Sequence, residues 1–313
     1  MAIAIDICIP IYDESVRDLL VVLWNQQKQI SNATIKVYLI DDASPDLVLR
    51  EKNESSAKEF EAVYVQQQNN LGRSKTRNAF LKYSQAEWLL FLDGDSMPAG
   101  PDFLEHYLEY IRSSSHSGLI YGGTKYNSEI KDNHRLHYSY AIDREALPVN
   151  QRIKNPAGSF HANNFLVHRD VLESYPFEER LTHYGHEDSL FAIRLAEKNI
   201  AIQHIDNPVL HLGLDDNYRF LEKTQQAVRH LAHIHFCLPP HVLRKYSSLW
   251  KWYERCKLFY PRALSTLWIE RWMQKQEQQM RAGKYRSKYF ALYKLLYLLH
   301  LDPLSKMHRN SIT

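Results

Sequence analysis

The stretch EWLLFLDGDSMP, residues 87–98, decides the fold of this chain. It joins an apolar run to Asp93, Gly94 and Asp95, so that two carboxylates follow the run directly. A short apolar run bounded by turn residues predicts a buried strand. In open α/β sheets, ligands bind beyond the carboxyl ends of the strands, and aspartates there suit a hard divalent cation that accompanies a diphosphate. The stretch therefore predicts a metal–nucleotide site at a strand end, with an ordinary acidic turn as the alternative.

Strand and helix patterns alternate on both sides of this stretch. Apolar segments typical of strands cover residues 3–11, 35–40, 60–67 and 87–92. Helical patterns separate them, for example over residues 14–27 and 72–84. Strands that alternate with helices predict βαβ units, and therefore an α/β fold with a doubly wound, mostly parallel sheet.

The alternation weakens in the second half of the chain. The segments predicted there are a strand at 118–126, a strand and helix at 163–175, a helix at 186–199, a strand at 200–205 and a loop at 207–213. From about Asp215 onward the pattern is helical, with breaks at Pro239-Pro240 and Pro261.

The composition is that of a globular protein with one large domain or two small ones. The chain has 313 residues and a formal net charge of +3. It contains no apolar stretch of about 18 residues, so no transmembrane helix is expected. The first residues lack a basic region before their apolar stretch and predict a strand, not a signal peptide. Its 3 cysteines are widely spaced, which predicts no disulfide framework and fits a reducing cytoplasm.

The net charge hides an asymmetry between the two ends of the chain. Residues 241–313 hold 15 Lys and Arg against 4 Asp and Glu, whereas the remainder holds 24 against 32. The same C-terminal stretch carries four of the 6 tryptophans. Such a shift in composition marks a functional or domain boundary.

Polar residues follow each of the first four predicted strands. Because the carboxyl ends of parallel strands lie along one edge of a sheet, these residues are expected to be neighbours. They would hold the base of a nucleotide at the first two strands and its diphosphate at the last two. Each group alone also fits a turn or a helix cap. In chain order they are Pro10, Tyr12 and Glu14; Asp41 and Asp42; Asn69, Asn70 and Gly72; and Asp93 and Asp95.

Six segments resemble, in the family's order, the motifs of family 2 glycosyltransferases with the GT-A fold. They are IPIYDES (9–15), DDASPD (41–46), NLGRSKTRN (70–78), DGDSMP (93–98), NFLVHRDVL (164–172) and GHEDSLFAIRL (185–195). The first departs from the family's P-x-Y-N pattern, because Asp13 stands where asparagine is usual. The resemblance covers about residues 3–213, and the ordered set is specific although each motif is short.

The resemblance implies how a nucleotide-sugar donor, most readily a UDP-sugar, would be held. Asp42 would accept a hydrogen bond from N3 of the pyrimidine, and Pro10 and Tyr12 would flank that base. Asp93 would contact the ribose or the donor sugar. Asp95 would bind Mn²⁺ or Mg²⁺, which stabilises the departing nucleoside diphosphate as a Lewis acid. The other residues of the predicted donor site are Glu14, Asn70, Gly72 and Gly94.

Two residues near this site have two interpretations each. Arg77 would add charge near the phosphates or hold Asp93 in place, or it would form an ion pair on a helix surface. His211, in the segment VLHLG, would be a further metal ligand, as in some related GT-A enzymes, or an ordinary loop or core histidine.

Glu187 and Asp188 follow Gly185 at the start of a predicted helix. Acidic residues in a first helical turn are favoured by the helix dipole, so capping alone would explain them. An inverting transferase also needs one ionised carboxylate to accept the proton of the acceptor hydroxyl. By resemblance Asp188 is that base, Glu187 orients the acceptor or the base, and Asn164 belongs to the acceptor site.

The C-terminal stretch mixes Trp, Tyr, Leu, Lys and Arg at helical spacing. Trp268 and Trp272 are one turn apart, and Tyr289, Tyr293 and Tyr297 form a stripe. Basic helices with an aromatic face bind anionic membranes, whereas the alternative is packing on the catalytic domain or in a dimer. Nucleic acid is not an expected partner, because no recognised nucleic-acid module frames the charge.

The sequence as a whole predicts a GT-A domain over residues 1–215 and a helical extension over 216–313. The expected function is metal-dependent, inverting transfer of a hexose to a saccharide hydroxyl in bacterial surface polysaccharide synthesis. The expected location is the cytoplasm, with peripheral membrane binding if the basic helices contact lipid. A sugar-phosphate nucleotidyltransferase is the enzymatic alternative, but it would carry a Gly-rich basic loop where this chain has IPIYDES. A non-catalytic saccharide-binding subunit is the other alternative, and it would be expected to lack Asp95 or Asp188.

Overall fold

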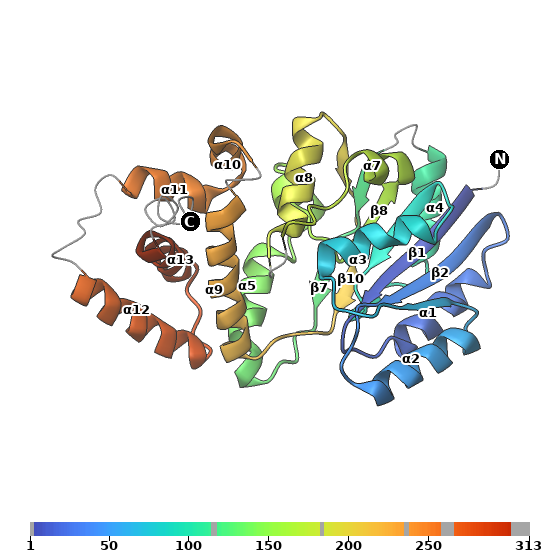
Figure 1. Cartoon of the computed structure of the whole chain (residues 1–313), viewed down its shortest axis with the longest axis horizontal. Coiled ribbons are helices and arrows are strands. Elements are labelled where there is room, and N and C mark those ends of the chain that lie inside the picture. The colour runs from blue at the N-terminus through green and yellow to red at the C-terminus, as the bar shows by residue number, and fades with distance from the viewer. Residues whose placement is uncertain (1–2, 114–117, 182–184, 235–237, 258–265, 302–313) are drawn as a thin grey trace. The chain divides into compact units, whose positions relative to one another are not determined.

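The computed structural model describes residues 3–113, 118–181, 185–234, 238–257 and 266–301 (Figure 1). Contacts divide the chain into two compact units. The first, here called the sheet unit, comprises residues 1–127, 145–182 and 187–213. The second, the helical unit, comprises residues 128–144, 183–186 and 214–313.

The sheet unit is built on a seven-stranded sheet with the order β3-β2-β1-β4-β8-β6-β9. Neighbouring strands are parallel except that β8 runs antiparallel to both β4 and β6. The predicted α/β class with a mostly parallel sheet is therefore confirmed. The strands are β1 (Ile3–Ile11), β2 (Ala33–Asp41), β3 (Val63–Gln66), β4 (Trp88–Leu92), β6 (Leu119–Tyr121), β8 (Asn164–His168) and β9 (Ile202–His204).

Apolar side chains of the central strands pack against two helices to form the main core. Ile5, Ile7 and Ile9 of β1 alternate with residues on the other face, as expected for a strand buried on both sides. They share a cluster with Leu20 of α1 and Tyr107 of α4. The helices of this unit are α1 (Arg17–Gln27), α2 (Leu47–Glu59), α3 (Arg73–Ala79), α4 (Phe103–Ser113), α6 (Val149–Arg152), α7 (Arg169–Ser174) and α8 (Glu187–Glu197), with 3₁₀ turns at Phe80–Lys82 and Ala157–Ser159.

A second, three-stranded sheet corrects two of the predictions. It consists of β5 (Ser96–Pro98), β10 (Val209–His211) and β7 (Thr124–Tyr126), with β10 in the middle. The single strand predicted over 118–126 is split into β6 and β7, because Gly123 has φ +101 and passes close to the guanidinium of Arg152. The loop predicted over 207–213 contains β10, a strand too short to produce a recognisable alternation.

The described residues beyond 215 are mostly helical, as predicted, and the helical unit also contains α5, which was not predicted. Leu136 of α5 packs in one cluster with Phe220 and Leu221 of α9 and with Met280 of α12 and Phe290 of α13. The elements are a 3₁₀ turn (Asp132–His134), α5 (Arg135–Arg144), α9 (Asn217–Ile234), α10 (Pro240–Tyr246), α11 (Ser248–Cys256), α12 (Thr266–Arg281) and α13 (Ser287–Leu301).

The breaks within these helices agree with proline chemistry. Pro240 occupies the first turn of α10, where a missing N–H costs nothing, and Pro239 caps it. Pro261 lies outside the described residues. None of the helices described in this chain is long and apolar enough to cross a membrane. The predicted domain boundary at residue 215 stays a prediction.

Candidate active site

The four polar strand ends predicted to be neighbours lie at one edge of the sheet. The strands β3, β2, β1 and β4 are adjacent and mutually parallel, so their carboxyl ends point the same way. The segments that follow them therefore line a single edge of the sheet unit.

Asp42 anchors the loop that follows β3. Its Oδ1 accepts a hydrogen bond from the backbone N–H of Leu71 at 2.7 Å, and its Oδ2 accepts one from Gly72 at 2.9 Å. Gly72 has φ +82 as it begins α3, a conformation that favours glycine. Asn70 is exposed on the same loop. Each carboxylate oxygen keeps a second lone pair, so the pyrimidine contact expected of Asp42 stays a prediction.

The loop after β1 is held by the turn that follows β2 and by α2. The N–H of Asp13, which has φ 57, donates to Ser44 Oγ at 2.8 Å, and Asn53 Nδ2 donates to the carbonyl of Glu14 at 2.8 Å. Pro10 is half-buried at the end of β1, and the Tyr12 side chain is 52% exposed. The loop thus presents an aromatic side chain beside the sheet edge, where a flanking base contact is expected.

Carboxylates crowd the end of β4. The side chain of Glu14 packs on Gly94, where an added Cβ would meet Glu14 Oε1 at 2.5 Å. Burial raises the pKa of Glu14 to about 8, and the charges of Asp95 and Asp93 contribute to the rise. Burial likewise raises the pKa of Asp93, although Arg77 opposes it. The raised pKa values mean that full ionisation of these carboxyl groups is unfavourable without a partner, and a bound cation at this edge would favour their charged forms.

Asp95 forms a pair with His211, which β10 brings beside it. His211 Nδ1 lies 3.2 Å from Asp95 Oδ1. Burial acts to raise the pKa of Asp95, but the hydrogen bond and charge of His211 outweigh it and lower the pKa. At Gly213, an added Cβ would lie 2.0 Å from Asp95 Oδ2, so the chain passes directly over the carboxylate.

This pair fits a divalent cation such as Mn²⁺. A carboxylate and an imidazole are suitable ligands for it. Among the described residues, no group of three or more His, Cys, Asp or Glu could hold a metal by itself. The protein would therefore supply Asp95 and His211, and phosphate oxygens and water would complete the coordination shell, as is usual for a nucleotide-bound metal.

A buried arginine joins this edge to the start of α8. Arg77 Nη2 donates to Asp93 Oδ1 at 2.9 Å and to the carbonyl of Ala162 at 3.1 Å. Its Nη1 lies 3.7 Å from Glu187 Oε1. Because Arg77 is only 3% exposed, it is not a surface ion pair, and it does hold Asp93 in place. Glu187 is also buried and accepts a hydrogen bond from Arg73 at 3.2 Å.

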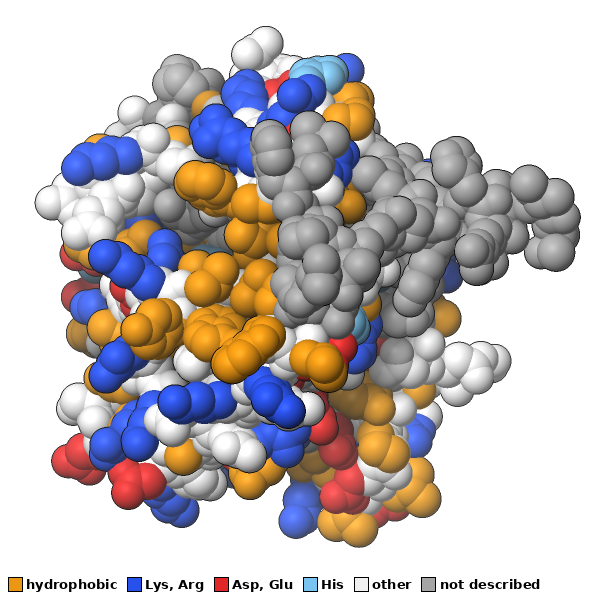
Figure 2. Space-filling view, turned by 90° about the vertical axis from the view of Figure 1, so that its left-hand side faces the viewer, with side chains coloured by type: hydrophobic (Ala, Val, Ile, Leu, Met, Phe, Trp, Pro, Cys, Tyr) orange, Lys and Arg blue, Asp and Glu red, His pale blue; other side chains and the backbone are white. Residues whose placement is uncertain are grey.

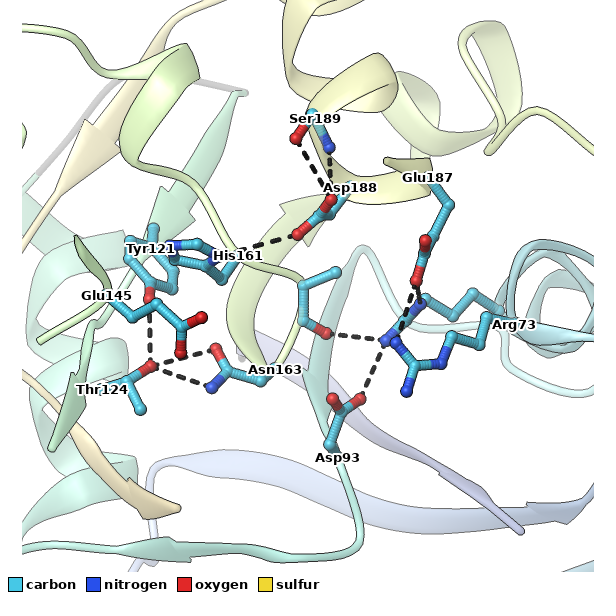
Figure 3. Close-up of polar contacts among 12 residues, drawn as sticks. Arg73, Asp93, Tyr121, Thr124, Glu145, His161, Asn163, Glu187, Asp188 and Ser189 are labelled. Atoms are coloured by element: carbon cyan, nitrogen blue, oxygen red, sulfur yellow. Dashed lines mark hydrogen bonds and ion pairs between the residues drawn. The ribbon is translucent and has the colours of Figure 1, made fainter. Parts of the chain in front are cut away.

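Asp188 follows Glu187 and is oriented by its own helix and by a histidine. Its Oδ1 accepts from the N–H of Ser189 at 2.6 Å, and its Oδ2 lies 3.7 Å from His161 Nδ1 (Figure 3). Burial acts to lower the pKa of His161, but the contact with Asp188 and the charge of Glu145 outweigh it and raise the pKa.

Residues 6–175, more than half of the chain, match the family model described as Glycosyl transferase family 2. This span contains Asp42, Arg77, Asp93 and Asp95 of the site. The chain belongs to glycosyl transferase family 2.

One curated relative is similar over part of the transferase. An "Uncharacterized glycosyltransferase" of Haemophilus influenzae is 29% identical over 97 residues. These are 31% of this chain and 31% of the relative, so the match leaves most of both proteins uncompared.

Solved structures show the fold of the transferase. The mannosyltransferase PcManGT of Pyrobaculum calidifontis, solved with GDP-Man and Mn²⁺, has a TM-score of 0.54 at 15% identity over 96% of this chain and 86% of its own. Glucosyl-3-phosphoglycerate synthase of Mycobacterium tuberculosis, with Mn²⁺ and UDP, has 0.51 at 13% identity over 74% and 79%. TarS of S. aureus has 0.50 at 16% identity over 98% and 92%. These similarities confirm the expected GT-A fold.

The predicted acceptor residue Asn164 has a different environment from the one expected of it. Its side chain is fully buried, accepts from the hydroxyl of Tyr107 at 2.8 Å, and donates to the carbonyls of Gly123 and Asn207 at 2.9 Å. With both amide hydrogens used inside the core, the geometry gives no support to an acceptor contact. Asn164 joins β8 to the turn between β6 and β7.

The transferase site also contains residues that the sequence did not indicate. Glu145 accepts a hydrogen bond from the Tyr126 hydroxyl, and Figure 3 shows it beside His161 and Asn163. Its negative charge contributes to raising the pKa of both His161 and His211. Neither Glu145 nor His161 lies in a motif, so only their spatial position reveals them.

Proposed function

We propose that this glycosyltransferase moves a hexose from a UDP-sugar to a hydroxyl of a growing saccharide, with inversion at the anomeric carbon. The observation that carries the proposal is the buried guanidinium of Arg77, which contacts both Asp93 and Glu187. This single cation ties the carboxylates of the donor side to the acidic pair that opens α8. The two halves of an inverting reaction are thereby held in one rigid arrangement.

On the donor side, Asp95 and His211 would hold the metal, and Asp93 contacts the ribose or the sugar. When bound, Mn²⁺ or Mg²⁺ would neutralise charge on the departing diphosphate. Arg77 keeps Asp93 in position, and Asp42 secures the loop against which the base lies. Pro10 and Tyr12 flank the base, while Glu14, Asn70, Gly72 and Gly94 complete the donor site.

On the acceptor side, Asp188 is the general base. One of its carboxylate oxygens accepts the proton of the acceptor hydroxyl while that oxygen bonds to the anomeric carbon. The bond from the anomeric carbon to the diphosphate breaks, and its electron pair leaves with the nucleoside diphosphate. Ser189 and His161 orient Asp188, and Glu187, fixed by Arg73 and Arg77, orients the acceptor or the base.

The setting that we propose is bacterial surface polysaccharide synthesis on the cytoplasmic side of the membrane. A screen of nucleotide-sugars with Mn²⁺, measuring nucleoside diphosphate release, tests the donor class. UDP should bind with Mn²⁺ in calorimetry, and Asp95→Ala should abolish the metal-dependent part of that affinity. Unchanged metal-dependent affinity in the variant, or release from no sugar nucleotide, would contradict the proposal.

We further propose that the helical unit associates with anionic membranes. Its aromatic and apolar side chains pack partly in its own core, yet Trp268 is 76%, Leu267 67% and Trp252 54% exposed. Figure 2, which faces the C-terminal helices, shows a hydrophobic band with Lys and Arg on both sides. Sedimentation with phosphatidylglycerol vesicles at low and high salt tests this. Salt-sensitive binding is expected, and no binding by the intact chain would overturn it.

A further inference from the structure

A pocket of about 540 Å³ lies between α12 and α13 within the helical unit. Five residues of α12 line it at spacings of three and four, so they share one face of that helix. The turn after α12 and the first turn of α13 supply the opposite wall. The lining residues are Trp272, Lys275, Gln276, Gln279, Met280, Lys284, Arg286, Tyr289 and Phe290.

The charge of this pocket is one-sided. Lys275, Lys284 and Arg286 line it, and the lining contains no Asp or Glu. Among the described residues, none of these three cations forms an ion pair with a carboxylate. Glu277, the nearby acid of α12, instead accepts hydrogen bonds from the Tyr293 hydroxyl at 2.7 Å and from Gln225 at 3.3 Å. The pocket therefore concentrates positive charge that no carboxylate among the described residues neutralises.

The turn that carries two of these cations is fixed by the rest of the unit. Gly283 adopts φ +75, and its N–H donates to the carbonyl of Met280 at 2.8 Å. Asn217 Nδ2 donates to the carbonyl of Arg281 at 3.2 Å, and the Tyr285 hydroxyl donates to Asp143 at 2.8 Å. Because the Tyr285 side chain is fixed by Asp143, its neighbours Lys284 and Arg286 lie on a pre-organised turn. Pre-organisation lowers the entropic cost of binding an anion.

The remaining lining residues indicate what accompanies the anion. Trp272 and Tyr289 meet edge to face with ring centroids 6.4 Å apart, and the buried Met280 and Phe290 form the floor. Gln276 and Gln279 provide amide groups that donate to and accept from hydroxyls. Lys and Arg bind phosphate oxygens, and aromatic rings cover the C–H faces of a polyol. The volume leaves room for more than a phosphate ion.

We propose that this pocket binds a phosphate ester of a polyhydroxylated group, such as a glycerol-phosphate or sugar-phosphate unit. Lys275, Lys284 and Arg286 hold the phosphate, the two glutamines bond the hydroxyls, and the two rings cover the carbon skeleton. Such a unit comes either from a phospholipid headgroup or from a phosphorylated saccharide, and the two sources share this chemistry.

Calorimetry on the full chain tests the site. Glycerol phosphate is titrated in the presence of EDTA, so that no metal supports phosphate binding at the carboxylate site. The double variant Lys275→Gln/Arg286→Gln should bind at least tenfold more weakly than the native chain. The matched control Arg271→Gln/Lys288→Gln removes two exposed cations from the same segments outside the pocket, and it should change the affinity less than twofold.

Other outcomes are equally decisive. Equal weakening in both double variants would mean that overall charge, not the pocket, binds the ester, and the proposal would be overturned. Inorganic phosphate binding as tightly as glycerol phosphate would overturn the polyol part. If the pocket variant also loses binding to phosphatidylglycerol vesicles, the source is the lipid headgroup. If it loses binding only to the soluble ester, the source is a phosphorylated saccharide.

Tryptophan fluorescence gives a second measurement, because Trp272 lines the pocket. Binding of glycerol phosphate should change the fluorescence of the native chain. Trp272→Phe should remove that change, while binding measured by calorimetry persists.

Discussion

Asp188 is the residue whose chemistry the proposed reaction needs most. Asp188→Asn keeps the shape of the side chain and its contact with Ser189, but it removes the ability to accept a proton. We expect turnover to fall by roughly a hundredfold or more, the scale of a lost general base. UDP affinity should change little, because Asp188 acts on the acceptor side. Transfer rate and UDP binding of the variant give the measurement.

Glu187→Gln is the matched comparison within the same helical turn. Glu187 is buried against Arg73 and Arg77, so this variant should weaken positioning and lower turnover less than Asp188→Asn does. If Asp188→Asn transfers sugar at a near-normal rate and Glu187→Gln is inactive, then Glu187 is the general base and Asp188 the positioning residue. If neither substitution slows transfer, the pair is a helix cap, and the proposed mechanism lacks its base.

His161 gives the site a pH-dependent contribution to stability. The contact with Asp188 raises the pKa of His161 above the value of about 6.5 for an unfolded histidine. Its stabilising effect is therefore fully present below pH about 6.5 and is lost as the pH rises through the folded pKa. We expect His161→Gln to destabilise the protein by up to about 1 kcal/mol more at pH 5.5 than at pH 9, the scale of a partly exposed ion pair.

Urea unfolding at both pH values measures this difference. His241→Gln, at an exposed position of α10, is the matched control for the loss of a histidine side chain. A cost for His161→Gln that does not depend on pH would show that its contact with Asp188 carries no charge.

At the scale of elements, long alternating segments were predictable and short ones were not. The strand predicted at 3–11 is β1, Ile3–Ile11, because a β-branched isoleucine occupies every second one of its nine positions. The strands β5, β7 and β10 have three residues each and form only because they pair with one another. Local patterns do not encode such pairings.

The same distinction applies to the site. That Asp42, Asp93 and Asp95 share one sheet edge could be predicted, because each closely follows a predicted strand and topology brings such positions together. The roles of His161 and Glu145 depend on contacts between residues that are distant in sequence, and no spacing of residues along the chain predicts such contacts. The burial of Arg77 likewise needed its two carboxylate partners in place, so the sequence left a surface ion pair open.

Gly213 lets the segment after β10 pass over Asp95. In Gly213→Ala the new Cβ would lie 2.0 Å from Asp95 Oδ2, so the carboxylate must turn away from its position beside His211. We expect at least a tenfold loss of Mn²⁺-dependent UDP affinity with the fold retained, since the clash involves one short side chain. Calorimetry with and without Mn²⁺, together with circular dichroism, measures both.

Gly100→Ala is the control, because an added Cβ there meets nothing within 4 Å. It should bind UDP like the native chain. Native-like metal-dependent affinity in Gly213→Ala would mean that the position of Asp95 beside Gly213 is not needed for the metal.

Across the whole molecule, composition located the basic C-terminal stretch but not the helix that joins its unit. Residues 128–144 lie far from the basic stretch in sequence, yet contacts group them with residues 214–313. The change in charge near residue 241 does not predict that α5 joins this unit, because α5 packs there through apolar side chains. The position of Leu136 in the core becomes apparent only from its packing against Phe220 and Met280 in the structure.

This shared core predicts that the C-terminal helices are not a removable appendage. A chain ending at residue 257 loses α12 and α13, which contribute Met273, Met280, Phe290 and Tyr293 to the cluster. Leu136, Phe220 and Leu221 would then face water, at about 1.5–3 kcal/mol for each side chain. We expect the shortened chain to aggregate in size-exclusion chromatography, whereas the full chain carrying Lys275→Gln and Arg286→Gln elutes normally. A monodisperse shortened chain with native-like melting would mean that α5 and α9 are stable without α12 and α13.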